Sequence, residues 1–314
     1  MSISTKQAYG KALLNLGSHN DKVIVLDGDL AKATCTLEFG KAYPDRFFNM
    51  GIAEQDLYST AAGLATCGLI PFATTFAMFS AGRAYDQIRN SIAYPKLNVK
   101  IVGVHGGLST GPDGASHQCI EDISLMRTIP NMVVVSPTDP LETAKAVDAI
   151  AKYQGPVYLR LSRDPMPIIT KEDRNFTIGK ADRLFEGEDL TIIANGVMLH
   201  KALKVREQLE QEGISARVIN LHTIKPIDIQ EVLQAASETK KLVTLEDHNI
   251  IGGLGSAVSE IVTDNYPVPV LRLGVNDVFG QSGTADELFD YYGLGLENII
   301  KSIKFFLIKK AVAI

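Results

Sequence analysis

The segment VHGGLSTGPDGASHQ holds the densest group of residues that could do chemistry. His105 and His117 stand near its two ends, twelve residues apart, and the loop between them holds four glycines: Gly106, Gly107, Gly111 and Gly114. Glycine at this density lets a backbone approach a ligand closely, at a cost in conformational entropy that a purely structural loop has no reason to bear. No further ligand follows at metal spacing, so the two histidines favour general acid–base chemistry over zinc binding.

Glu54 and two phenylalanines could hold a flat ligand. Glu54, in GIAEQ, opens a segment of small and apolar residues. A carboxyl group there could share a proton with a ring nitrogen, which requires a raised pKa, although the helix dipole favours an acidic residue at that position whatever its role. Phe76 and Phe79 could stack on the same ligand or belong to the core. The small residues that follow them, SAG, leave room for a ring.

Two further groups place charge at predicted turns. Asp27 and Asp29 flank Gly28 and could hold a metal ion or a ligand amine, yet Asp-Gly-Asp is also ordinary turn chemistry. Arg163, in LRLSR, could bind an anion bidentately, or it could be a solvated charge at the end of a strand. The residues alone leave both alternatives open.

The elements that must position these residues alternate between short β-rich runs and longer segments of helical period. The sequence predicts strands at 23–26, 71–76, 99–104, 132–135 and 157–161, and helices at 4–16, 53–67, 84–92, 120–128 and 141–152. Small and apolar residues nearly all round the segment 53–67 predict an inner helix. The alternation is typical of a parallel α/β fold, in which ligands bind beyond the carboxyl ends of the strands.

A second α/β unit follows a break in this pattern. Residues 163–190 are rich in Pro, Gly and charge and have no sustained period. The alternation then restarts, with strands at 190–194, 216–220, 241–246 and 268–273 and helices at 199–212, 229–237 and 253–262. We therefore expect a domain over residues 1–165, a linker over 166–188 and a second domain over 189–314. The basic and apolar tail from residue 301 could form a last helix.

Composition argues against several classes of protein. Lys and Arg (31) nearly balance Asp and Glu (36), so the net charge is −5 and nothing suggests nucleic-acid binding. No apolar run approaches the roughly 20 residues of a membrane helix, and MSISTKQAYG lacks a secretory pattern, so we expect a cytoplasmic chain without membrane contact. Cys35, Cys67 and Cys119 have no CxxC spacing. We expect them to be buried thiols, and we expect no metal site in this chain.

Several motifs, in order and spacing, resemble the carboxyl-terminal half of transketolase. They are GIAEQ, the TF…F segment with RAYDQIRNSIAYP, HGGLSTGPDGASHQ with EDISLMRTIPN, LSR, TIKP and EDHNIIGGLGSAV. The resemblance covers essentially the whole chain. It implies two parallel-sheet domains, namely a pyrimidine-binding domain for thiamine diphosphate and the transketolase C-terminal domain.

The resemblance also implies a partner. Full-length transketolases hold the diphosphate and its metal ion through a GDG motif, which this sequence lacks. We therefore expect the second subunit of a split transketolase, in an α2β2 assembly whose separate N-terminal subunit holds most of the Mg²⁺ or Ca²⁺ site. The implied reaction moves a two-carbon ketol unit from a ketose phosphate, or a related anionic ketose, to an aldose phosphate.

The same resemblance assigns four residues to the cofactor. Glu54 matches the glutamate that hydrogen-bonds the pyrimidine ring nitrogen of thiamine diphosphate, and Phe79 matches the ring that stacks on the pyrimidine. Phe76 stands beside Phe79, and Asp29 matches an aspartate near the cofactor. With Glu54 in this role, the cofactor's own amino group acts as the base, so the protein needs no strong base of its own.

Four more residues are assigned to the sugar by resemblance. His117 matches a histidine that assists proton transfer at the donor carbonyl, and His105 matches one that binds the sugar near its first carbons. Asp113 matches a residue that reads a sugar hydroxyl, and Arg163 one that holds the terminal phosphate.

Two positions depart from the family pattern at this anionic end. Lys6 stands where transketolases commonly have an arginine, and Ala33 stands where a serine commonly contacts the same phosphate. The planar guanidinium group of an arginine is thus replaced by the compact ammonium group of a lysine, and the hydroxyl donor of a serine is lost. The substrate could therefore end in a different group, such as a sulfonate, or be a shorter phosphosugar, although lysine also binds phosphate.

Other interpretations remain open at this point. The beta chain of a 2-oxoacid dehydrogenase shares the architecture, but GPDGASHQ fits transketolase better. Synthases of the deoxyxylulose-phosphate type normally carry all their domains on one chain. A catalytically silent scaffold subunit would have no physical need for Glu54, His105, His117 and Arg163 together.

Overall fold

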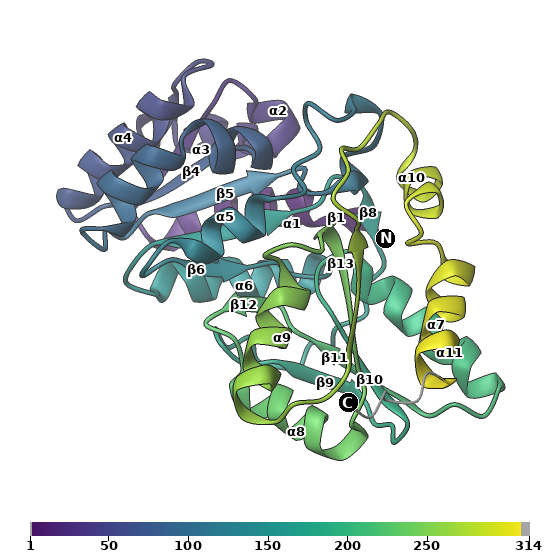
Figure 1. Cartoon of the computed structure of the whole chain (residues 1–314). Helices are drawn as coiled ribbons and strands as arrows, with labels where there is room; N and C mark the ends of the chain where they lie inside the picture. The colour runs from purple at the N-terminus through teal and green to yellow at the C-terminus, as the bar shows by residue number, and fades with distance from the viewer. Residues whose placement is uncertain (1, 309–314) are drawn as a thin grey trace.

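The computed structural model describes residues 2–308, which form two mainly parallel sheets with helices on both faces of each (Figure 1). Within these residues, the larger sheet has seven strands in the order β12-β6-β7-β5-β4-β2-β3. The strands are β2 (Val23–Asp27), β3 (Phe47–Asn49), β4 (Ile70–Phe76), β5 (Lys100–Val104), β6 (Val133–Val135), β7 (Val157–Leu161) and β12 (Thr223–Lys225). All neighbours pair in parallel except β12, which is antiparallel to β6. Central strands of this kind are rich in Val, Ile and Leu because both of their faces are buried.

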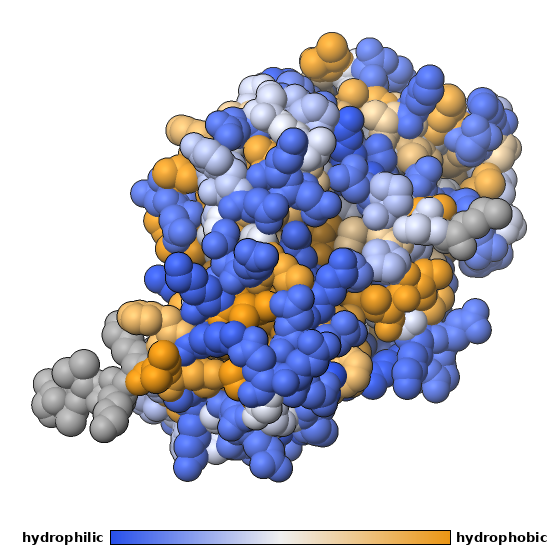
Figure 2. Space-filling model, turned by 90° about the vertical axis from the view of Figure 1, so that its right-hand side faces the viewer, coloured by the Kyte–Doolittle hydropathy of each residue, from blue (hydrophilic) through white to orange (hydrophobic). Residues whose placement is uncertain are grey.

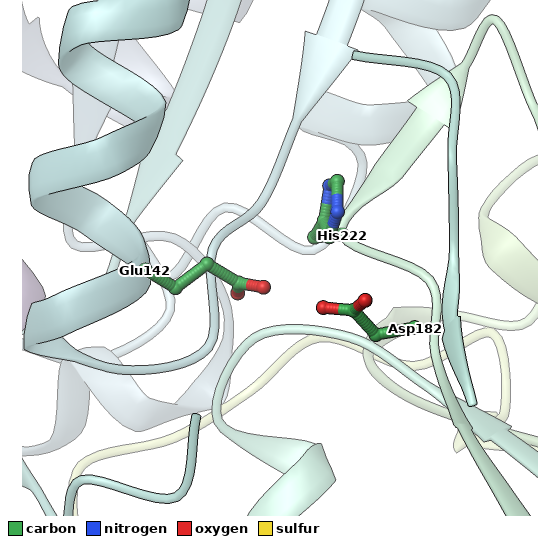
Figure 3. A group of neighbouring side chains, drawn as sticks. All are labelled: Glu142, Asp182 and His222. Carbon is green, nitrogen blue, oxygen red and sulfur yellow. The ribbon is translucent and has the colours of Figure 1, made fainter. Parts of the chain in front are cut away.

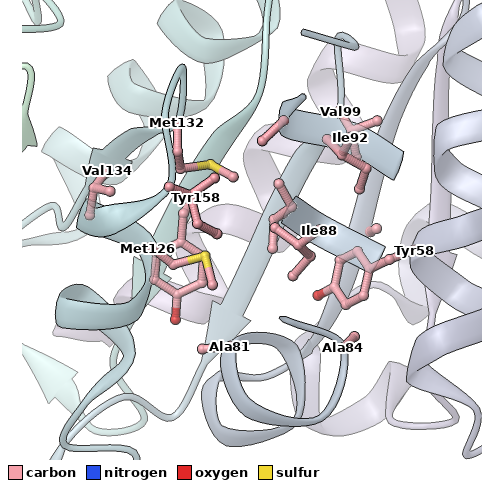
Figure 4. Close-up of a cluster of buried hydrophobic side chains, with 14 of the residues drawn as sticks. Tyr58, Ala81, Ala84, Ile88, Ile92, Val99, Met126, Met132, Val134 and Tyr158 are labelled. Carbon is pink, nitrogen blue, oxygen red and sulfur yellow. The ribbon is translucent and has the colours of Figure 1, made fainter. Parts of the chain in front are cut away.

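Helices cover both faces of the larger sheet. One face carries α1 (Thr5–His19), α3 (Leu37–Ala42) and α6 (Pro140–Lys152), and the other carries α4 (Glu54–Thr66) and α5 (Asp122–Thr128). Strand β2 shows the division, because Val23 and Val25 pack in the cluster of α1, whereas Ile24 and Leu26 pack in the cluster of α4. Side chains from α4, α5 and the strands converge in this second cluster (Figure 4). The sequence prediction of a parallel α/β domain is confirmed.

Short helical turns lie in several connections between the strands. They are α2 (Ala31–Thr34), the 3₁₀ turns η1 (Pro44–Arg46) and η4 (Leu108–Asp113), and the π-helical turns η2 (Phe79–Arg83) and η3 (Gln87–Ala93). The regular helix expected over 84–92 is thus replaced by two wider turns. Turns of this type often occur at functional sites, and here η2 carries an aromatic ring and a guanidinium group.

The smaller sheet has the strand order β14-β13-β10-β11-β9 among the described residues. Its strands are β9 (Asp182–Phe185), β10 (Leu190–Ala194), β11 (Ala216–Asn220), β13 (Leu242–Asn249) and β14 (Val270–Val275). Helices α7 (Met198–Gln211), α10 (Ala285–Tyr291) and α11 (Leu296–Ile308) cover one face, and α8 (Ile229–Thr239) and α9 (Leu254–Asn265) cover the other. The strands and helices expected in the second half all form, with ends shifted by a few residues.

Three pairings were not expected from the sequence pattern, and one of them connects the two halves of the chain. Strand β12 belongs by sequence to the second half, yet it extends the larger sheet. Strand β1 (Ile3–Ser4) pairs with β8 (Pro165–Met166). The segment expected to be a linker contains β9, which pairs with β11 at the edge of the smaller sheet. The expected last helix forms as α11, and the tail residues 309–314 lie outside the described residues.

Two expectations about burial were wrong in part. The helix α4 buries one face, including Leu57 and Ala61, but Gln55, Asp56 and Ser59 are exposed in this chain. Its small residues therefore do not make it an inner helix of the single chain. The cysteines also differ from the expectation: Cys119 is buried, Cys35 is half-buried and Cys67 is exposed, and all three are free thiols.

The surface is mixed. Hydrophilic residues cover most of the face that carries α10 and α11, and hydrophobic residues form separate patches between them (Figure 2). Among residues 2–308, the structure contains no helix with the length and apolar character that crossing a membrane requires.

Candidate functional site

Three adjacent strands of the larger sheet end beside one another, and residues that the sequence analysis identified lie at or just after their carboxyl ends. Strand β4 ends at Phe76, β5 is followed directly by His105, and Arg163 stands two residues beyond β7. Because β5 pairs with both β4 and β7, the three residues lie at one edge of the sheet. This carboxyl edge is the usual ligand-binding edge of a parallel sheet.

Phe76, Phe79, His105 and His117 form one aromatic cluster. The ring centroids of Phe76 and His105 are 4.3 Å apart, and those of Phe76 and Phe79 are 6.0 Å apart in a stacked arrangement. The ring of His117 meets Phe79 edge-on at 5.3 Å and Phe76 at 6.1 Å. Phe76 is buried, whereas Phe79 and His117 are half-exposed. The structure therefore brings together both phenylalanines and both histidines that the sequence proposed for the site.

Glu54 reaches this cluster through Arg83. Glu54 is the first residue of α4 and is only 2% exposed. The guanidinium of Arg83 donates to Oε2 of Glu54 at 2.8 Å, and its central carbon lies 4.6 Å from the centre of the Phe79 ring. The side chain of Arg83 is 48% exposed. Sequence reasoning missed Arg83, although its position about one helical turn after Phe79 was an available signal.

His105 is buried in a strained backbone position. Its φ angle is +61°, in the left-handed region that non-glycine residues rarely adopt, and such strain often accompanies function. Nζ of Lys6 lies 3.0 Å from its Nε2 atom. Burial lowers the pKa of His105 to about 3, and the positive charges of Lys6 and Arg163 act in the same direction. The imidazole is therefore neutral at physiological pH.

Lys6, one of the two departures, is part of this site. It stands in the first turn of α1, half-buried, and burial lowers the pKa of its ammonium group. The other departure, Ala33, is a half-buried residue of α2 that packs against the cluster of α1.

Arg163 and Asp113 interact with each other and with the glycine loop. The guanidinium of Arg163 donates to the carbonyl of Thr110 at 2.6 Å and pairs with the carboxylate of Asp113 at 3.1 Å. Both charged side chains are about one-third exposed, at 31% and 33%. These contacts hold the glycine loop in place. They also keep the guanidinium group of Arg163 beside the loop, where the negative end of a ligand could bind.

The second half of the chain also holds the glycine loop, a contribution that sequence reasoning missed. The carboxylate of Asp247, in β13, accepts the backbone N–H of Leu108 at 2.8 Å and of Ser109 at 3.2 Å, and the Ser109 hydroxyl at 2.7 Å. A side chain on Gly107 would collide with this carboxylate, since a Cβ atom there would lie 2.2 Å from Oδ2. The acidic run EDH that ends β13 was the only sequence signal.

Asp27 and Asp29 have separate roles. The carboxylate of Asp27 is buried and accepts the backbone N–H of Leu30 and the hydroxyls of Thr34 and Thr36, so it stabilises the turn. Burial raises its pKa. Asp29 is exposed and accepts the Asn49 amide at 2.8 Å. Within residues 2–308, no hydrogen bond or ion pair joins Asp29 to the aromatic cluster.

Comparisons with known proteins identify the family of both halves of the chain. Residues 1–167 match the family described as "Transketolase, pyrimidine binding domain", and residues 179–299 match "Transketolase, C-terminal domain". The chain is 51% identical over 301 residues to a Methanocaldococcus jannaschii protein named "Putative transketolase C-terminal section", with 95% of this chain and 94% of that protein covered.

A second relative and a solved structure cover the chain almost completely. The "6-deoxy-6-sulfo-D-fructose transketolase subunit SqwH" of Clostridium sp. is 41% identical over 297 residues, which cover 95% of this chain and 92% of that protein. The structure titled "Split gene transketolase, inactive beta4 tetramer" superposes with a TM-score of 0.90 at 48% identity, covering 99% of this chain and 100% of that one. Two matched domains and relatives of this identity and coverage show that the chain belongs to the transketolase family.

Proposed function

We propose that this chain is the pyrimidine-side subunit of a two-chain transketolase and that it works with thiamine diphosphate and a separate subunit. The reaction moves a two-carbon ketol unit from an anionic ketose to an aldose phosphate. The names of the relatives support transketolase over the beta chain of a 2-oxoacid dehydrogenase. The single observation that carries the assignment is the group formed by Glu54, Arg83 and Phe79.

The residues present fit an aminopyrimidine ring. A guanidinium group is planar and carries N–H donors, and that of Arg83 bonds the buried carboxylate of Glu54 while it lies over the Phe79 ring. An aminopyrimidine needs the same two contacts, a carboxyl partner at a ring nitrogen and an aromatic ring parallel to its plane. The half-exposed side chain of Arg83 can move aside without unfolding the core.

Thiamine diphosphate, when bound, supplies the nucleophilic carbon that takes up the two-carbon unit. Glu54 holds a proton at the pyrimidine ring nitrogen, and Phe79 orients the ring with Phe76 behind it. His117, at the edge of both phenylalanines, assists proton transfer at the donor carbonyl. The neutral His105 binds the sugar near its first carbons and cannot act as a cationic acid at neutral pH.

The anionic end of the sugar is bound by Arg163 and Lys6. Nζ of Lys6 lies 3.0 Å from His105, and the positive charges of Lys6 and Arg163 both lower the pKa of that histidine. Asp113 pairs with Arg163 and reads a sugar hydroxyl. Lysine in place of arginine fits a sulfonate or a shorter phosphosugar, and the sulfofructose enzyme subunit among the relatives supports this choice.

The partner in this proposal is a separate subunit that binds the diphosphate and its Mg²⁺ or Ca²⁺ ion, in an α2β2 assembly. The names of the relatives, a C-terminal section and a subunit, support it, as does the inactive tetramer of β chains in the similar structure. Buried anions need a compensating cation, so half of the diphosphate site has little affinity for the cofactor.

Calorimetric titration and reconstitution test this function. The chain alone, with Mg²⁺, should bind thiamine diphosphate weakly and have no transketolase activity. The product of a neighbouring gene that contains GDG, followed by an asparagine about thirty residues later, should then be added. Tight cofactor binding and transketolase activity should both appear. Tight binding of cofactor and Mg²⁺ by the isolated chain would contradict the split-subunit proposal.

A further inference from the structure

Three side chains that commonly bind metal ions meet where the two sheets join. Glu142 stands in the first turn of α6, Asp182 opens β9, and His222 lies between β11 and β12. One carboxylate oxygen from each acid and one ring nitrogen of His222 all lie within 4.8 Å of one another. The carboxylates of Glu142 and Asp182 face each other, and His222 lies beside the gap between them (Figure 3). They come from elements on both sides of the junction and are forty residues apart in the sequence, a spacing that no motif reveals.

Neighbouring groups orient these side chains. Nδ1 of His222 lies 2.9 Å from the Thr223 hydroxyl, and its ring stacks on Phe176 with centroids 4.1 Å apart. Nε2 is therefore the ring nitrogen left for an ion, with the other nitrogen held by an oxygen as in known metal-binding histidines. The Glu142 carboxylate accepts the Asn220 amide at 2.7 Å and the backbone N–H of Thr138 at 2.6 Å. Each carboxylate oxygen keeps a lone pair for a further ligand.

A buried polar atom next to the group lacks a partner. Asn220 is fully buried, and its Oδ1 atom has no hydrogen-bond partner among the described residues. Within residues 2–308, none of the three side chains hydrogen-bonds to another of the three, although they are this close. A cavity of about 10 Å³ adjoins the two acids, Glu142 and Asp182, and its lining does not include His222. That volume corresponds to about one small bound species.

The group contains two acidic side chains and one imidazole, and all three are common ligands of divalent metal ions. The cation that faces the group is Arg174, 3.3 Å from Asp182. The other nearby cation, Lys145, already donates to the carbonyls of Lys171, Glu172 and Arg174.

We propose that Glu142, Asp182 and His222 bind one divalent first-row transition-metal ion, best zinc, which ties α6 and β12 of the larger sheet to β9 of the smaller one. Two carboxylates and one imidazole suit zinc, with water or the free amide oxygen of Asn220 as a fourth ligand. Mg²⁺ and Ca²⁺ prefer oxygen ligands throughout. The ion would be structural, and the proposal is independent of the cofactor chemistry.

Metal analysis of the full chain tests the site. The purified chain is stripped with a chelator, dialysed against Zn²⁺ or Co²⁺ and analysed for bound metal. We expect one ion per chain, Co²⁺ absorption bands of nitrogen and oxygen ligands, and no competition from Mg²⁺. The absence of a thiolate band separates this site from the exposed Cys67.

Variants locate the site. Asp182→Asn, His222→Asn and Glu142→Gln should each weaken binding at least about tenfold. Asp182→Asn disturbs the core least because that side chain is 23% exposed, and a circular dichroism melt checks the folding of every variant. Matched controls are Asp264→Asn and His19→Asn, which change exposed residues elsewhere and should bind the ion normally.

Thermal stability gives a second readout. Zn²⁺ should raise the Tm of the stripped wild-type chain by several degrees and leave that of folded Glu142→Gln unchanged, because only an ion bound to the native state shifts the unfolding equilibrium. The proposal fails if the wild-type chain retains no stoichiometric ion. It also fails if folded Asp182→Asn binds Zn²⁺ like the wild type, or if the Tm shift is the same in every variant.

Discussion

Nζ of Lys6, on α1, lies 3.0 Å from Nε2 of His105, at the end of β5. An ammonium group can only donate, so Nε2 accepts and the ring proton resides on Nδ1. That Nδ1 atom is buried and has no partner among the described residues. An unsatisfied buried donor costs about 1–3 kcal/mol, and a ligand oxygen would remove this cost. The pair Lys6–His105 therefore presents a neutral histidine with a fixed tautomer to the site.

The pKa of His105 offers the first prediction. The NMR signal of its ring should not titrate above about pH 4, because burial and the charge of Lys6 hold its pKa to about 3. Lys6→Ala should raise this pKa but leave it below the ordinary value of 6.5, since burial is the larger cause. Lys11→Ala, an exposed lysine of the same helix, is the control. A wild-type pKa near 6.5 would contradict the prediction.

The same shift has a consequence for stability. The folded-state pKa of His105 is below its unfolded value of 6.5, so the unfolded chain binds more protons between pH 6.5 and 3. The stabilisation by the neutral ring is complete above pH 6.5 and is lost as the pH falls toward 3. Denaturant titrations of the wild type and His105→Asn should therefore show a smaller loss of unfolding free energy on acidification for the variant.

Glu54→Gln tests the cofactor role of Glu54. The amide keeps the shape but cannot share a proton with a ring nitrogen, so activity of the reconstituted enzyme should fall by about 10²–10⁴-fold while the Tm changes little. Asp56→Asn, in the same helical turn but exposed, should retain activity. A loss of less than about tenfold for Glu54→Gln would mean that Glu54 is only a helix-start charge.

Asp247→Asn tests whether the second half of the chain positions the glycine loop. The amide loses the negative charge that strengthens three hydrogen bonds to Leu108 and Ser109. We expect faster hydrogen exchange at these two amides, destabilisation of about 1–3 kcal/mol and a higher KM. Asp264→Asn, exposed on α9, is the control and should change none of these. Unchanged exchange at Leu108 would contradict the positioning role.

The anionic end of the substrate is tested by restoring the family pattern. The double change Lys6→Arg with Ala33→Ser should improve kcat/KM for fructose 6-phosphate or xylulose 5-phosphate about ten- to a hundredfold relative to a sulfonated or shortened analogue. His117→Ala should instead lower kcat/KM for every donor alike, because it acts at the reacting carbons. If the wild type prefers an ordinary sugar phosphate and the double variant leaves the ratio unchanged, the two departures do not select the substrate.

Local pattern determined most of the elements. Runs such as VIVLD and VYLRL predict buried strands because β-branched and apolar residues fill both faces of a parallel sheet, and β2 and β7 form there within one residue of the prediction. The edge strands of the larger sheet, β3 and β12, escaped prediction because they are short and only partly apolar. Strand β3 has three residues, as does β12, which also joins the sheet of the other half of the chain.

Site residues at strand ends could likewise be found from the sequence, since topology places the carboxyl ends of β4 and β5 side by side. The sequence, through its family resemblance, thus predicted that Phe76, His105 and Glu54 belong to one candidate site. Only the tertiary structure shows which distant side chains form hydrogen bonds to the residues of this site and its glycine loop. Arg83 bonds Glu54 across 29 residues, and Asp247 holds Leu108 across 139 residues. Such pairs depend on packing between distant elements, whereas local periodicity reports only the neighbours along a helix or strand. The meeting of Glu142, Asp182 and His222 has the same physical origin, because their spacing in the chain reflects no local repeat and only the docking of the two sheets brings them together.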